Sequence, residues 1–71
     1  MKSYFALRQR MYGAQINQKD IARYLNKSIG YVSDRFTLNH SWDLEDVYRI
    51  CELLEIEETR IPEFFPRLKR T

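Results

Sequence analysis

Apolar residues recur at intervals of three and four positions along most of this chain, which is the spacing that places them on one face of an α-helix. Tyr4, Leu7 and Met11 form the first such face. Gly13 follows them, and because glycine is a poor helix former we expect it to end this helix. The pattern therefore predicts a short amphipathic helix at the start of the sequence.

Two further short helices are predicted over residues 18–25 and 29–37. Asn17 precedes the first of them and Asp20 lies three positions later, which is an approximate capping box. Ser28 is well suited to cap the second. The buried sides of these two helices are expected to hold Ile21, Ala22, Leu25, Val32 and Phe36.

Asp43 is expected to cap a fourth helix, with Glu45 and Asp46 in its first turn, where the helix dipole favours acidic groups. Its buried side is expected to hold Leu44, Val47, Cys51 and Leu54, with Ile50 beside them. After Ile56 the chain is expected to make a short turn or two around Pro62. This last segment partly buries Ile61, Phe64 and Phe65, and is ended by Pro66.

The predicted fold is therefore all-α, with four to five short helices. Seventy-one residues make one small domain, and two Gly and two Pro are too few for a β-sandwich or barrel. Cys51 is the only cysteine, which excludes an internal disulfide and a cysteine-cluster metal site. Charges interrupt the first 13 residues, and no apolar run approaches the roughly 18 residues of a membrane span, so we expect a cytoplasmic protein.

Charge is distributed unevenly along the sequence. Residues 1–42 carry seven basic and two acidic side chains, a net charge of +5, whereas residues 43–66 carry eight acidic and two basic ones, a net charge of −6. Residues 67–71 add three basic groups. The first part is suited to binding a polyanion, or both parts are simply solvated surfaces. The acids of 43–58 are expected to form a solvated face, with binding of a partner as the alternative.

The helices predicted at 18–25 and 29–37 are separated by only three residues, so they must cross at a large angle, as in a helix-turn-helix. The stretch 17–33 resembles the helix-turn-helix of the Cro/lambda-repressor type, whose members are among the standard examples of this motif. The resemblance continues through 43–56, similar to the fourth helix of that family, and covers roughly forty residues. The matching positions of the motif are Gln18, Ala22, Leu25, Ser28 and Val32.

Three features depart from the pattern of the family. Asn26 stands where glycine is usual in the turn, and asparagine tolerates the left-handed conformation. Arg35 stands where an apolar residue is common, and its side chain can extend past the core to a phosphate. Met11 and Phe36 stand where some members have a buried Arg–Glu pair, which a sulfur–aromatic contact can replace.

The resemblance implies that the helix 29–37 lies in the major groove of DNA. Ile29 can touch a thymine methyl group, Gly30 lets the backbone approach closely, and Ser33 can hydrogen-bond a base. The residues expected to face the bases are Ile29, Gly30, Tyr31, Ser33 and Asp34.

Two interpretations of Asp34 remain open. Its carboxylate can accept a hydrogen bond from a cytosine amino group. Alternatively, because phosphates repel it, it pairs with Arg35 or Lys27 and only orients them.

The resemblance also implies contacts to the DNA backbone, since the N-terminus of the helix 18–25 points free amides at a phosphate. The residues expected to make such contacts are Asn17, Gln18, Lys19, Lys27, Ser28, Arg35, Thr37, Asn39 and His40. His40 is the only histidine and has no cysteine near it, so no metal site is assigned. Trp42 either packs on the fourth helix as a lid of the core or lies against sugar–phosphate.

The expected function is a sequence-specific, double-stranded DNA-binding regulator like the Cro or repressor proteins of phages, acting in the bacterial cytoplasm at the nucleoid. Residues 1–66 would be the DNA-binding domain and 67–71 a short basic tail. The alternative is an antirepressor-like module that binds protein on the same frame. The sequence holds no arrangement typical of an enzyme, and no cofactor or small-molecule ligand is expected. Whether the protein forms a weak homodimer, assembled only on DNA, is left open. It is also left open whether residues 61–65 form the dimer surface or close the core of one copy.

Overall fold

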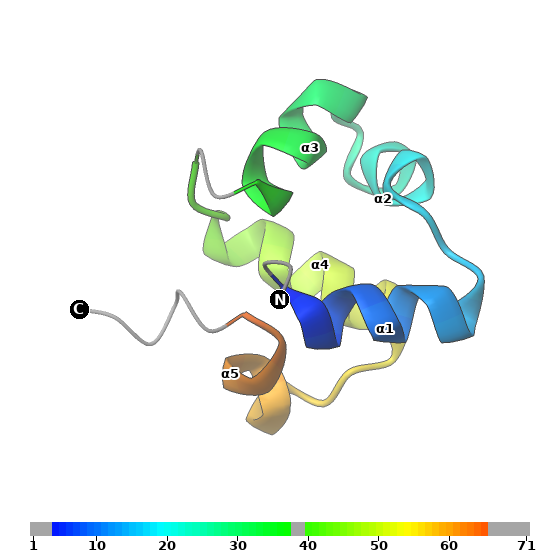
Figure 1. Cartoon of the computed structure of the whole chain (residues 1–71). Helices are drawn as coiled ribbons and strands as arrows, with labels where there is room; N and C mark the ends of the chain where they lie inside the picture. The colour runs from blue at the N-terminus through cyan, green and yellow to red at the C-terminus, as the bar shows by residue number, and fades with distance from the viewer. Residues whose placement is uncertain (1–3, 38–39, 66–71) are drawn as a thin grey trace.

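The computed structural model describes residues 4–37 and 40–65, and over these residues all of the regular secondary structure is helical, which confirms the predicted fold class. The helices are α1 (Phe5–Ala14), α2 (Gln18–Leu25), α3 (Ile29–Phe36), α4 (Leu44–Leu54), the 3₁₀ helix η1 (Glu58–Arg60) and α5 (Ile61–Phe64). Helix α2 packs on α3 and α4, and α1 packs on α4 and α5. Figure 1 shows α2 and α3 together at one end of the molecule and α5 at the other.

The predicted local signals of the α2–α3 pair are confirmed. The Asn17 side chain accepts a hydrogen bond from the backbone N–H of Asp20, whose carboxylate accepts one from the N–H of Asn17. Asn26 ends α2 in the left-handed conformation, with φ of 60° and ψ of 44°. The Ser28 hydroxyl then caps α3 by accepting from the N–H of Tyr31 at 3.0 Å. Figure 1 shows α2 nearly end-on while α3 runs across the view, so the two helices cross at a large angle.

The core is centred on four aromatic side chains from distant parts of the chain. Phe36 packs edge to face against Tyr4 and Trp42, with ring centroids 5.8 and 5.7 Å apart. Phe65 packs in the same way against Tyr4 and Trp42, at 6.1 and 6.3 Å. Trp42 is therefore part of the core and not of the outer surface, as the first of the two interpretations predicted.

The end of the described chain also closes the core of a single copy. Phe64 and Phe65 are both buried, which favours the core over the dimer surface for these residues. Pro66, expected to end this segment, lies outside the described residues. None of the helices formed by the described residues is long and apolar enough to span a lipid bilayer.

A non-local contact joins α1 to the end of α4. The Arg10 guanidinium donates to the carbonyl oxygens of Leu54 and Glu55, at 3.1 and 2.7 Å. These carbonyls lie at the C-terminus of α4, where the helix has unpaired acceptors and a negative dipole end. The arginine therefore serves as a C-terminal cap supplied by another helix.

Three expectations were wrong, one about the end of a helix, one about a buried residue and one about a helix cap. Gly13 does not end α1, which continues to Ala14 and is followed by Gln15 in the left-handed conformation. Leu44 is 58% exposed and not buried, because it is the first residue of α4 and projects beyond the packed part of the helix. Asp43 is the residue before α4, but its side chain makes no capping hydrogen bond.

Candidate nucleic-acid interface

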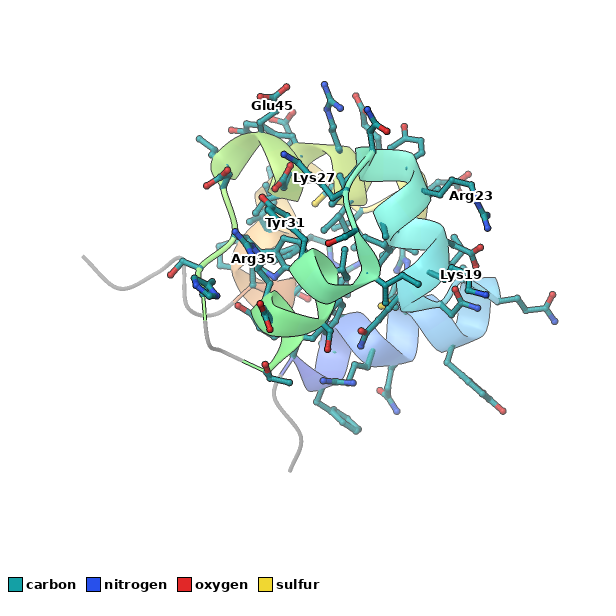
Figure 2. The ribbon with its side chains drawn as sticks, turned by 90° about the horizontal axis from the view of Figure 1, so that it is seen from above. Lys19, Arg23, Lys27, Tyr31, Arg35 and Glu45 are labelled. Atoms are coloured by element: carbon teal, nitrogen blue, oxygen red, sulfur yellow. The ribbon has the colours of Figure 1, made fainter. Side chains whose placement is uncertain are left out.

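The surface around α3 gathers many of the residues that were expected to contact DNA. Figure 2 looks onto the end of the molecule that carries α2 and α3. Ile29 and Gly30 are exposed at the start of α3, and Ser33 and Asp34 are partly exposed one turn later. We define the α2–α3 face by its members Gln18, Lys19, Ile29, Gly30, Ser33, Asp34 and Thr37.

Positive side chains lie on both sides of α3. Lys19 projects from α2, whereas Lys27 and Arg35 lie along the other side of α3, toward α4 (Figure 2). Over residues 4–37 and 40–65, none of these three forms an ion pair, while Arg23 is paired with Asp20 at 3.2 Å. Cations on both sides of an exposed helix match the two phosphate backbones that border a DNA groove.

The N-terminus of α2 offers backbone donors to this same surface. The N–H groups of Gln18 and Lys19 donate to no acceptor in the described part of the chain. The side-chain oxygens of Asn17 and Ser28 are already used as helix caps, so what these residues can still offer a phosphate is a donor group. Free amides at a positive dipole end are suited to binding an anion.

Asp34 lies on the exposed side of α3 with half of its side chain accessible. Its carboxylate is 3.9 Å from Nδ1 of His40, and the side chains are 50% and 61% exposed. The alternative that it pairs with Arg35 or Lys27 was wrong, since neither forms an ion pair with it in the described residues. Thr37, the residue after α3, donates through its hydroxyl to the Asp34 backbone carbonyl at 3.1 Å.

Tyr31 is positioned differently from the other residues expected to face the bases. Its hydroxyl donates to Oδ2 of Asp46 in α4 at 2.5 Å. Its ring lies 4.9 Å from Nζ of Lys27 and 3.5 Å from Cζ of Arg35. The tyrosine is thus turned toward α4, and Asp46, expected on the solvated acidic face, is buried with 7% exposure.

The Tyr31–Asp46 hydrogen bond makes stability depend on pH in the alkaline range. Donation of this hydrogen bond to Asp46, followed by burial and the negative charge of Asp46, raises the pKa of the Tyr31 phenol to about 12. The raised pKa stabilises the folded chain below pH 10, and this contribution of about 1–2 kcal/mol is lost as the pH rises through 12. We expect the difference in free energy of unfolding between the wild type and Tyr31→Phe, measured by urea denaturation, to shrink by about 1–2 kcal/mol between pH 10 and 12.

Tyr12→Phe is the control for that titration, because Tyr12 is 87% exposed. It should match the wild type at every pH. A Tyr31→Phe difference that stays constant from pH 9 to 12 would contradict the assigned hydrogen bond.

Some expected contacts lie outside the described residues, namely Asn39 and the basic tail 67–71. Within the described residues, no group of three or more His, Cys, Asp or Glu side chains is placed to hold a metal ion. No family model matches the sequence, and no curated protein or solved structure is significantly similar to it. The function is therefore inferred from the α2–α3 face and the side chains that border it.

Proposed function

We propose that this protein is a sequence-specific double-stranded DNA-binding transcription regulator that reads an operator half-site with α3 in the major groove. The observation that carries the proposal is the position of Lys19 on one side of an exposed α3 and of Lys27 and Arg35 on the other (Figure 2). The resemblance of the α2–α3 segment to the Cro/lambda-repressor helix-turn-helix supports the same function.

Each part of the α2–α3 face has its own role in this proposal. The amides of Gln18 and Lys19 bind one phosphate at the N-terminus of α2. Ile29 contacts a thymine methyl group, while Ser33 and Asp34 hydrogen-bond to base edges, with Asp34 accepting from a cytosine amino group. If two copies bind an inverted repeat, their α3 helices lie about 34 Å apart, one turn of DNA.

The test is selection of binding sites from a random pool of duplexes with the purified protein at moderate salt. We expect one sequence to be enriched, as an inverted repeat if two copies bind together and as a single half-site if one does. Affinity for the enriched duplex should fall steeply with salt, because bound phosphates release counterions. No enrichment, together with salt-insensitive weak binding, would contradict DNA reading and favour the antirepressor-like alternative.

Ser33→Arg should change the enriched sequence, because arginine prefers the O6 and N7 atoms of guanine. Thr59→Arg is the matched control, since it adds the same charge on exposed η1, at the far end of the molecule from α3 (Figure 1). The control should enrich the same DNA sequence as the wild type and gain at most a little affinity for it. An unchanged preference in Ser33→Arg would show that Ser33 does not face the bases.

A further inference from the structure

Lys27, Tyr31 and Arg35 form a column along the side of α3 that faces α4 (Figure 2). Arg35 lies one helical turn after Tyr31, and Lys27 lies four residues before it, in the connection between α2 and α3. The tyrosine ring therefore has a cation near it from each direction. The Arg35 guanidinium is the closer of the two, with Cζ 3.5 Å from the ring centroid. Its Nη also donates to the Tyr31 backbone carbonyl at 3.2 Å, so the stacking contact and this hydrogen bond hold it to the same residue.

The tyrosine ring is itself fixed from the opposite side. Asp46, in the first turn of α4, is buried and accepts the hydrogen bond from the Tyr31 hydroxyl. The carboxylate is held in place by the N-terminal end of the α4 dipole, which favours an acid there. Tyr31 is therefore anchored to α4 at its hydroxyl, and its ring supports the two cations.

This arrangement has a consequence for the freedom of the cationic side chains. Lysine and arginine each lose up to about 2 kcal/mol of rotamer entropy when they are ordered on a ligand. Contact with a fixed aromatic ring removes part of that freedom before the ligand arrives, and cation–π attraction keeps the charge near the ring. Neither Lys27 nor Arg35 has a carboxylate partner in the described residues, so no acidic side chain there neutralises either charge. Lys27 is exposed, whereas Arg35 is partly buried and its Nε is covered, so its terminal nitrogens are the donors that would meet an anion.

We infer that Tyr31 is a positioning residue, which holds Lys27 and Arg35 as a pair of phosphate-binding cations at the α4 side of α3 and does not itself contact DNA. The inference rests on the proposed function. It assigns the pair to the DNA backbone, and it makes α4 contribute to DNA affinity through Asp46 without touching the duplex.

The experiment measures binding to a fluorescein-labelled 20-base-pair duplex of mixed sequence by anisotropy, over a series of NaCl concentrations. The slope of log affinity against log salt reports the number of phosphates neutralised, at about 0.9 per contact. Tyr31→Leu should flatten this slope by about 1–2 and weaken binding about tenfold. Tyr31→Phe keeps the ring but loses the hydroxyl that anchors it to Asp46, so it should flatten the slope by less than Tyr31→Leu does.

A coupling measurement separates positioning from a general structural effect. Lys27→Gln/Arg35→Gln should flatten the slope as Tyr31→Leu does, and adding Tyr31→Leu to it should change nothing further. Tyr24→Leu is the matched control, because the Tyr24 hydroxyl likewise donates to an acid of α4, Glu52, at 3.3 Å, but no cation is found on its ring in the described residues. It should keep the slope. Far-ultraviolet circular dichroism confirms that each variant is folded.

The outcomes distinguish this inference from the proposed function. If the wild type binds with a steep salt slope and Tyr31→Leu retains that slope, the inference is wrong and the proposed function stands. The same holds if the loss caused by Tyr31→Leu adds to that of the double glutamine variant. A wild type that shows no salt-dependent binding to any duplex would overturn the proposed function, and the inference with it.

Discussion

The Phe36→Ala variant is expected to be unfolded in a substantial fraction of molecules at room temperature. Phe36 has no accessible surface and packs against Tyr4 and Trp42, so truncation leaves a cavity at the centre of the aromatic cluster. Such a change costs about 3–5 kcal/mol. A chain of this length has a total stability of only about 4–10 kcal/mol. Urea denaturation followed by circular dichroism measures the loss.

Phe5→Ala is the control for this experiment, because Phe5 is 47% exposed on the outer side of α1. It removes the same atoms, but the free energy of unfolding should fall by less than about 0.5 kcal/mol, as it does for surface substitutions in general. Equal denaturation midpoints for the two variants would contradict the placement of Phe36 in the core. A large loss for Phe5→Ala would show instead that its exposed ring is covered in solution.

Substitutions of Gly30 are expected to separate DNA binding from stability. Gly30 lies in α3 with a negative φ, and a Cβ added there would meet only the Ser28 hydroxyl, at 3.9 Å. The fold therefore does not need glycine at this position, and alanine should stabilise the helix by up to about 1 kcal/mol. If the backbone of Gly30 approaches the bases, Gly30→Ala should nevertheless weaken binding to the selected duplex about tenfold, and Gly30→Leu more.

Gly13→Ala is the matched variant. Gly13 is also helical, and a Cβ added there would meet nothing within 4 Å. It should gain about the same stability and bind DNA as the wild type does. Melting temperatures and duplex affinities of the three variants test the prediction. Undiminished affinity in Gly30→Leu would place Gly30 away from the bases.

The sequence predicted the parts of the fold that depend on neighbours in the chain. The capping box of Asn17, the left-handed Asn26 and the cap at Ser28 are each set by residues within four positions, so their signals are local. The inward sides of α2 and α3 followed from helical periodicity in the same way. Leu44 was wrongly placed because periodicity does not show where a helix extends beyond the elements that cover it.

The parts that were missed depend on contacts between distant residues. Arg10 caps α4 from α1, and Asp46 is buried beneath Tyr31, although both look like ordinary surface charges in the sequence. The one available signal was Arg35, a charged residue at an otherwise apolar position of the motif. The aromatic ring of Tyr31 lies one helical turn away, and a guanidinium at position 35 can stack on it. The contacts of the α2–α3 face with DNA remain predictions.

The contact between Tyr4 and Phe65 has a consequence for how the chain folds. These rings lie 6.1 Å apart although they stand at opposite ends of the described chain, so their contact closes a loop of roughly sixty residues. Closing such a loop costs about 4 kcal/mol of chain entropy, which only the rest of the core can offset. The contact should therefore form late in folding. In hydrogen exchange, the amides at the two ends should open before those of α2 and α4.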